Sequence, residues 1–171
     1  MPGHYLLSRK WSMTERFTIT DDTGAPQFEV QGRFAFTKKL SISDNAGAEV
    51  AVISRQAFSS RFEIRLAGRA GVATVRPRGF FGTRYEIESP AGPMEARGNF
   101  SGRNYAVARG GVTVATVSQR RSLRQRFAIE VADGEDPVLM LAVILVIEAI
   151  RDQRRDSAGA AGAAGAASAG G

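Results

Sequence analysis

The sequence of 171 residues contains no cysteine, and its only histidine is His4. The lack of cysteine excludes a disulfide framework, a thiolate metal site, a cysteine nucleophile and S-palmitoylation. A Ser–His or Cys–His catalytic pair has no plausible partners either, because one histidine stands alone near the N-terminus. We therefore expect a non-enzymatic protein with no catalytic residues, no bound metal and no cofactor.

Motifs for nucleotides, calcium and export are also missing. The glycines do not form a phosphate-binding loop ahead of a helix, and the turn aspartates lack the further oxygen ligands of a calcium loop. The N-terminal residues show no basic segment leading into an apolar one, so nothing there predicts export. The expected location is the cytoplasm, peripheral at the inner face of the membrane.

Basic residues outnumber acidic ones, which gives a net charge of +6 and a pI near 10.5. A surplus of positive charge favours anionic partners, such as lipid headgroups or nucleic acid. Several arginines stand singly along predicted strands, and we expect these to be solvated, outward-facing positions. They are Arg65, Arg97, Arg103 and Arg109.

A repeated phrase organises most of the chain. Residues 17–30, FTITDDTGAPQFEV, align without a gap on residues 40–53, LSISDNAGAEVAVI. In both, apolar residues alternate with polar ones and lead into Asp-x-x-Gly, which is typical of a β-hairpin turn. Weaker copies begin at Phe62, Tyr85, Tyr105 and Phe127. Each unit is predicted to be one hairpin.

Five hairpins, a strand after Phe127 and an N-terminal strand within residues 5–10 add up to about twelve antiparallel strands. A meander of this size avoids exposed edges best by closing into a barrel. A ring much wider than about eight strands leaves an interior that its own side chains cannot fill. The sequence thus requires a segment that occupies the interior.

Residues 138–150, VLMLAVILVIEAI, are the candidate for that segment, and Glu148 is their only polar residue. Asp136 and Pro137 are typical of a helix start. A helix that is apolar all round belongs in a core, and thirteen residues are too few to cross a bilayer. A β-strand and a membrane-spanning helix are the second and third alternatives. The predicted domain covers residues 1–155, and residues 156–171, rich in alanine and glycine, are predicted to be a disordered tail.

Together, these features resemble the LURP-one-related family, which shares a barrel with a central helix with tubby C-terminal domains and phospholipid scramblases. The resemblance rests on the paired phrases FTITDDTG and LSISDNAG, on Tyr85-Glu86-Ile87 before Gly92, on Arg97-Gly98-Asn99 before Tyr105, and on the apolar helix. It covers the chain from Tyr5 to about Arg155. It implies an all-β, tubby-like fold: a closed, roughly twelve-stranded antiparallel barrel around a buried C-terminal helix. Because the motifs carry the fold and not chemistry, the resemblance names no site residues.

Two basic segments are the candidate anion-binding or lipid-binding sites. The first, RPRGFFGTR, contains Arg76, Arg78 and Arg84 around Phe80 and Phe81, which could insert into a membrane or, alternatively, fold back onto the barrel. The second, QRRSLRQRF, contains Arg120, Arg121, Arg124 and Arg126. Both connect one hairpin unit to the next, so we expect them at the same end of the barrel.

The leading hypothesis is a binding module that engages an anionic membrane lipid, such as a phosphoinositide, or a protein partner through these basic loops. The alternative is a scramblase-like protein anchored in the membrane by residues 138–150. Nucleic-acid binding is the third hypothesis, because the sequence lacks the stacking aromatic strands of an RNA-binding surface. No integral membrane span is expected.

Overall fold

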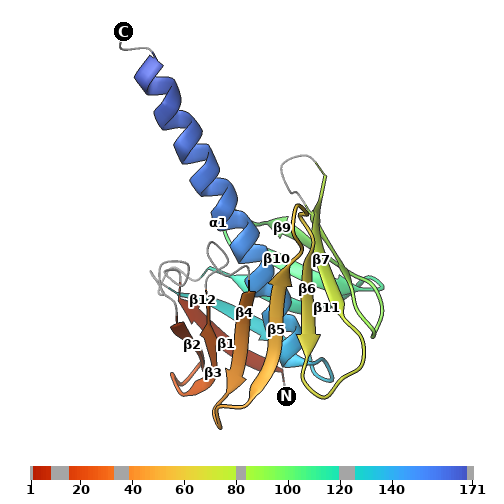
Figure 1. Cartoon of the computed structure of the whole chain (residues 1–171). Helices are drawn as coiled ribbons and strands as arrows, with labels where there is room; N and C mark the ends of the chain where they lie inside the picture. Colours follow the sequence, from red (N-terminus) through yellow and green to blue (C-terminus); the bar gives the residue numbers. More distant parts are fainter. Residues whose placement is uncertain (1, 9–15, 33–38, 80–83, 120–125, 169–171) are drawn as a thin grey trace.

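Twelve strands and one helix make up the computed structural model of the chain, which describes residues 2–8, 16–32, 39–79, 84–119 and 126–168 (Figure 1). The strands are β1 (Gly3–Ser8), β2 (Arg16–Asp21), β3 (Pro26–Gln31), β4 (Lys39–Asp44), β5 (Glu49–Arg55), β6 (Phe62–Leu66), β7 (Ala73–Arg78), β8 (Arg84–Glu88), β9 (Met94–Asn99), β10 (Asn104–Arg109), β11 (Val112–Ser118) and β12 (Arg126–Val131). The helix is α1 (Pro137–Ser168).

The sheet is a closed antiparallel barrel in which each strand pairs with its neighbours in the sequence. Closure is made by β1, whose Tyr5 lies opposite Asp21 of β2 on one side and Ile129 of β12 on the other. Apolar side chains alternate into the interior, as in the buried Leu40 and Ile42 of β4. The structure therefore confirms the predicted twelve-stranded barrel, because period-two alternation buries one face of every strand.

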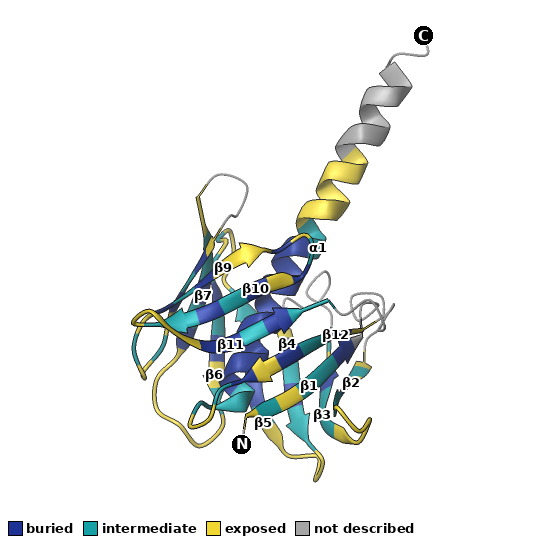
Figure 2. Ribbon diagram, turned by 180° about the vertical axis from the view of Figure 1, so that it is seen from behind, coloured by how far each residue is buried: buried dark blue, intermediate teal, exposed yellow. Residues whose placement is uncertain are grey.

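Helix α1 fills the interior of this barrel (Figure 2). Every residue from Leu139 to Arg151 is buried. The Asp136 carboxylate caps the helix start by accepting the N–H groups of Val138 at 2.9 Å and Leu139 at 3.3 Å. The buried helix is confirmed, and the strand alternative is wrong. No described helix is both long enough and apolar enough to cross a membrane.

The two best-matched repeats form the same turn. In each, one aspartate oxygen accepts the backbone N–H groups two and four residues later, all at 2.9 Å: Asp21 from Thr23 and Ala25, Asp44 from Ala46 and Ala48. Asp21 also accepts from the Thr23 hydroxyl and the Gln27 amide, and these donors, with the hydroxyl foremost, hold the pKa of its carboxyl below the ordinary value. The repeated Asp-x-x-Gly phrase thus encodes a repeated hairpin, as predicted.

The helix end differs from the prediction. We expected it near Ile150, followed by a disordered tail, whereas α1 continues to Ser168 and projects out of the barrel (Figures 1 and 2). Alanine is the strongest helix former, so an alanine-rich segment extends a helix that is already nucleated. The division of the chain into a domain and a tail at residue 155 stays a prediction.

The barrel has two distinct ends. At the exit end, where α1 leaves, the odd-numbered strands finish and the even-numbered strands begin. At the entry end, residues 132–136 lead from β12 into α1. Because β7 and β11 both finish at the exit end, the strand ends that flank the two basic segments lie at the same end of the barrel, as expected.

Candidate basic surface and buried ion cluster

Arginines of the first basic segment are already paired with carboxylates. Arg76 donates to Glu86 at 2.8 and 3.0 Å, and Arg78 donates to the same oxygen at 2.8 Å. These hydrogen bonds hold the pKa of Glu86 below its ordinary value, and the bond from Arg78 has the larger effect. Arg84 lies 3.7 Å from Glu95, which also accepts from Arg97 at 2.7 Å. Four guanidinium groups share two carboxylates here, so part of their charge is neutralised.

The other predicted residues are only partly placed. Phe80 and Phe81 lie outside the described residues, as do Arg120, Arg121 and Arg124. Arg126 is described: it opens β12 at the exit end and is exposed, and its carbonyl accepts from the Gln119 amide at 2.9 Å. The role of all these residues in binding stays a prediction.

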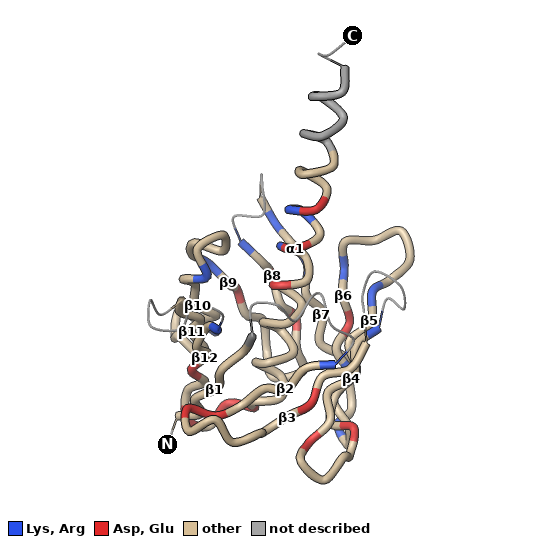
Figure 3. The backbone as a smooth tube through the Cα atoms, turned by 90° about the vertical axis from the view of Figure 1, so that its left-hand side faces the viewer, with Lys and Arg blue, Asp and Glu red and all other residues tan. Residues whose placement is uncertain are grey.

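Charge is polarised along the barrel axis. At the exit end, the charged residues of the strand termini and described connections are basic; at the entry end, acidic residues dominate (Figure 3). The basic group is Arg16, Lys39, Arg55, Arg61, Arg78, Arg84 and Arg126, and Arg103 lies buried at the same end. The acidic group is Asp21, Asp22, Asp44, Glu49, Glu88, Asp133, Glu135 and Asp136, accompanied by Arg69 and Arg109. Such a separation orients a protein before an anionic surface.

Some exit-end arginines keep their charge unpaired. Within the described ranges, no carboxylate forms an ion pair with Arg55, Arg126, Arg154 or Arg155. Arg154 and Arg155 are exposed on the first turn of α1 outside the barrel. Guanidinium groups without a carboxylate partner bind phosphate more readily than those held by Glu86 and Glu95, because no ion pair has to be broken. Among the described residues, Arg154 and Arg155 thus add positive charge on α1 outside the two basic segments.

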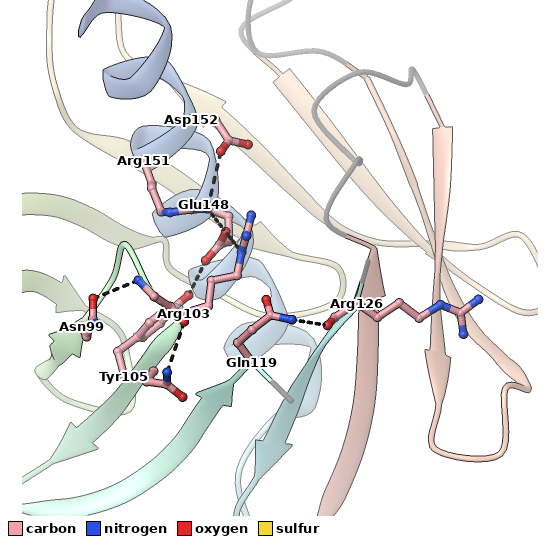
Figure 4. Close-up of polar contacts among 10 residues, drawn as sticks. Asn99, Arg103, Tyr105, Gln119, Arg126, Glu148, Arg151 and Asp152 are labelled. Atoms are coloured by element: carbon pink, nitrogen blue, oxygen red, sulfur yellow. Dashed lines mark hydrogen bonds and ion pairs between the residues drawn. The ribbon is translucent and has the colours of Figure 1, made fainter. Parts of the chain in front are cut away.

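A buried ion cluster fixes α1 to the barrel wall (Figure 4). Glu148, with no exposed surface, accepts from Arg103 at 2.8 Å, from Arg151 at 2.9 Å and from the Tyr105 hydroxyl at 3.1 Å. The Arg103 guanidinium also lies 5.0 Å from the centre of the Phe127 ring. Burial raises the pKa of Tyr105 well above its ordinary value, and the Glu148 charge adds to this, so Tyr105 is a stable donor.

Arg103 and Arg109 are corrections to the sequence analysis, which predicted solvated positions. Arg103 is buried because the turn before β10 gives it a φ of 53° and directs its side chain to Glu148. Arg109 is half-buried and binds Glu135 at 2.6 Å. Arg65 and Arg97 are exposed, as predicted. The missed signal was Glu148: a lone carboxylate in an apolar helix is a reason to expect a buried cationic partner.

The described residues offer no constellation with obvious chemistry of its own. No group of three histidine, cysteine or acidic side chains among them is arranged to hold a metal ion. A groove of about 610 Å³ lies over β8, β9 and β10 and is lined by both signs of charge, including Arg84, Arg97, Glu86 and Glu95. Mixed charge makes this groove a poor anion site compared with the exit end.

Comparison with known proteins gives a family and a fold. No curated protein matches the chain. The X-ray structure of the Arabidopsis thaliana protein AT5G01750 is similar, with a TM-score of 0.66 and 18% identity over 88% of this chain and 91% of that one. At this identity, the likeness shows the fold alone. The model of the LURP-one-related family matches residues 4–148, nearly the whole barrel and most of the buried helix. The chain therefore belongs to the LURP-one-related family.

Proposed function

We propose that this protein is a non-enzymatic binding module that engages anionic phospholipid surfaces, such as the inner face of a cell membrane, through its exit end. The observation that carries the proposal is the separation of charge along the barrel axis, with unpaired arginines beside the projecting helix. Each basic side chain near an anionic membrane adds about 1 kcal/mol of attraction. The acidic entry end is repelled by the anionic membrane, so it faces away from it.

Among the alternatives, a scramblase-like protein anchored by the apolar helix fits less well. Residues 139–151 are buried inside the barrel, so they would have to leave it before they could meet lipid. A basic surface also attracts nucleic acid, which would bind to the same arginines in the absence of a membrane. A protein partner with an acidic face is the remaining candidate.

Vesicle sedimentation tests the proposal with two matched arginines. Arg126 and Arg65 are both exposed, outward-facing strand residues, but Arg126 lies at the exit end and Arg65 toward the entry end of β6. We expect the protein to bind phosphatidylserine or phosphoinositide vesicles, but not phosphatidylcholine vesicles, and to dissociate at high salt. Arg126→Glu should weaken binding at least about tenfold, whereas Arg65→Glu should leave it nearly unchanged.

Other results would reject the proposal. If binding is absent, insensitive to salt or equally weakened by both substitutions, the exit end does not recognise anionic lipid. If the protein instead retards DNA or RNA in a gel shift with a steep salt dependence while ignoring vesicles, the nucleic-acid alternative holds.

A further inference from the structure

The connection between β5 and β6 exposes an aromatic ring at the exit end. Phe58 lies at its tip with its side chain completely exposed, 109% of the reference surface. Its φ is 57°, a left-handed conformation that an aromatic residue adopts at a cost in free energy. A ring that is both strained and without apolar contacts gains nothing for the isolated fold. The arrangement suggests that the ring has a partner elsewhere.

This tip is held in place by its own hydrogen bonds. Two backbone hydrogen bonds close the loop: the Gln56 N–H donates to the Arg61 carbonyl at 3.2 Å, and the Ser59 N–H donates to the Gln56 carbonyl at 3.3 Å. The Ser59 hydroxyl accepts from the Arg61 N–H at 3.0 Å, and the Ser59 carbonyl accepts from Arg55 at 3.2 Å. The ring is thus presented on a pre-formed loop, which lowers the entropic cost of binding.

A pocket of about 310 Å³ lies beside the base of the same hairpin, between β5, β7 and α1. Its polar lining consists of two arginines, two serines and a glutamine, and no carboxylate contributes. The Ser157 hydroxyl already donates to the Gln153 carbonyl at 2.9 Å, so the two guanidinium groups are the principal donors to an anion. The lining residues are Arg55, Ser60, Phe62, Pro77, Ile150, Gln153, Arg154 and Ser157. Arg55 comes from the barrel and Arg154 from the helix, and neither forms an ion pair within the described ranges. Guanidinium and hydroxyl groups on an apolar floor suit a phosphate ester.

We propose that this pocket binds the phosphate of an anionic phospholipid headgroup while Phe58 inserts into the adjoining interface of the bilayer. The inference rests on the proposed function and deepens it by assigning the lipid contact. Aromatic rings are stabilised at the boundary between headgroups and acyl chains, where cations hold the phosphates. A soluble phosphate would fill the pocket without using the ring, whereas a phospholipid uses both.

The test compares Phe58→Ser with the matched control Val112→Ser. Val112 is also an exposed apolar residue, but it opens β11 at the entry end. We expect Phe58→Ser to weaken binding to phosphatidylserine vesicles about tenfold, because the apolar contact is lost, and Val112→Ser to leave it unchanged. Arg55→Gln combined with Arg154→Gln should weaken it similarly. Circular dichroism and thermal melting establish that each variant is folded.

A second variant reports insertion directly. Phe58→Trp should retain vesicle binding, and its fluorescence should shift to the blue on addition of phosphatidylserine vesicles, beyond the change given by Trp11 in the parent. Inorganic phosphate and glycerophosphoserine, which carry the charge without acyl chains, should compete only weakly. If they compete as well as vesicles do, the pocket is a simple anion site and insertion is rejected.

The outcomes separate this inference from the broader function. If Arg126→Glu weakens vesicle binding but Phe58→Ser does not, the membrane function stands and the Phe58 contact is rejected. If the fluorescence of Phe58→Trp is unaltered while the vesicles sediment with the protein, the contact is rejected as well. If the parent protein binds no anionic vesicle, both proposals fall.

Discussion

Glu148 is the residue on which the interior of the barrel depends most. Its carboxylate lies among apolar side chains and receives donors from the barrel, Arg103 and Tyr105, and from the next turn of its own helix, Arg151. A buried charge is tolerated only when it is paired and hydrogen-bonded, because desolvation costs several kcal/mol. The cluster therefore fixes how far α1 is inserted into the barrel and how it is rotated about its own axis.

Replacing Glu148 by leucine should destabilise the fold by about 3 to 5 kcal/mol, because it leaves the buried Arg103 without its counter-charge. Replacing Glu148 by leucine and Arg103 by methionine should recover part of that loss, since only Arg151 then loses its contact with Glu148, and Asp152 still lies 3.6 Å from it. Urea unfolding measures both. A loss below about 1 kcal/mol for Glu148→Leu would mean that Arg103 reaches solvent easily and that the cluster does not hold the helix.

The hairpin is the element that the sequence predicts best, and Gly98 shows where sequence and packing meet. Gly98 has a φ of 137° and lies opposite Tyr105 in the β9–β10 pair. A Cβ atom at Gly98 would stand 2.7 Å from both the Asn104 carbonyl oxygen and the Tyr105 Cα. The glycine thus allows the two backbones to approach where Tyr105 reaches Glu148.

Gly98→Ala should therefore cost roughly 3 kcal/mol, the sum of a strained φ and of contact with backbone that cannot move aside. Gly47→Ala is the matched control: Gly47 also has a positive φ, 81°, but a Cβ atom there would meet no other atom within 4 Å. It should cost only about 1 kcal/mol. Thermal unfolding of the two variants measures both losses of stability. Equal losses would show that the close approach of the β9 and β10 backbones at Gly98 is unimportant.

Predictability differs between the elements for physical reasons. Strands, turns and the helix start follow from local patterns, namely period-two alternation, Asp-x-x-Gly and Asp136-Pro137, and the structure has all three. The burial of Arg103 could not be predicted from such patterns because it depends on a contact with Glu148, 45 residues away. Phe58 was missed for a similar reason, since no pattern distinguishes a ring that folds inward from one that the turn directs outward.

At the scale of the whole molecule, the barrel has a basic exit end and an acidic entry end, and helix α1 runs along its axis. The acidic turns and the basic strand ends alternate along the sequence, so the charges separate when consecutive strands pair antiparallel. Net charge therefore predicts an anionic partner, but not the face that meets it. Helix α1 projects from the basic end, so a surface that approaches this end also meets the helix (Figure 2).

Residues 157–168 of α1 extend about 18 Å at the rise of a helix, which exceeds the Debye length of about 8 Å at physiological salt. The segment has no charged residue, and residues 157–160 are exposed. If it stands straight, it keeps the basic end away from a flat membrane. Its glycines weaken the helix by about 1 kcal/mol each, so the segment can unfold or bend aside at modest cost.

Deleting residues 158–171, which keeps Ser157 of the pocket, should consequently leave the melting temperature of the barrel unchanged. It should also strengthen binding to anionic vesicles, because the basic end can then approach the surface without displacing this part of the helix. A chain that stops after Ile147 is the contrasting variant: it loses Glu148 and Arg151 and should not fold stably. Melting curves and vesicle sedimentation of both deletions provide the measurement. Weaker vesicle binding after removal of residues 158–171 would instead show that the alanine-rich part of α1 contacts lipid, and the membrane would then meet this segment before it meets the arginines.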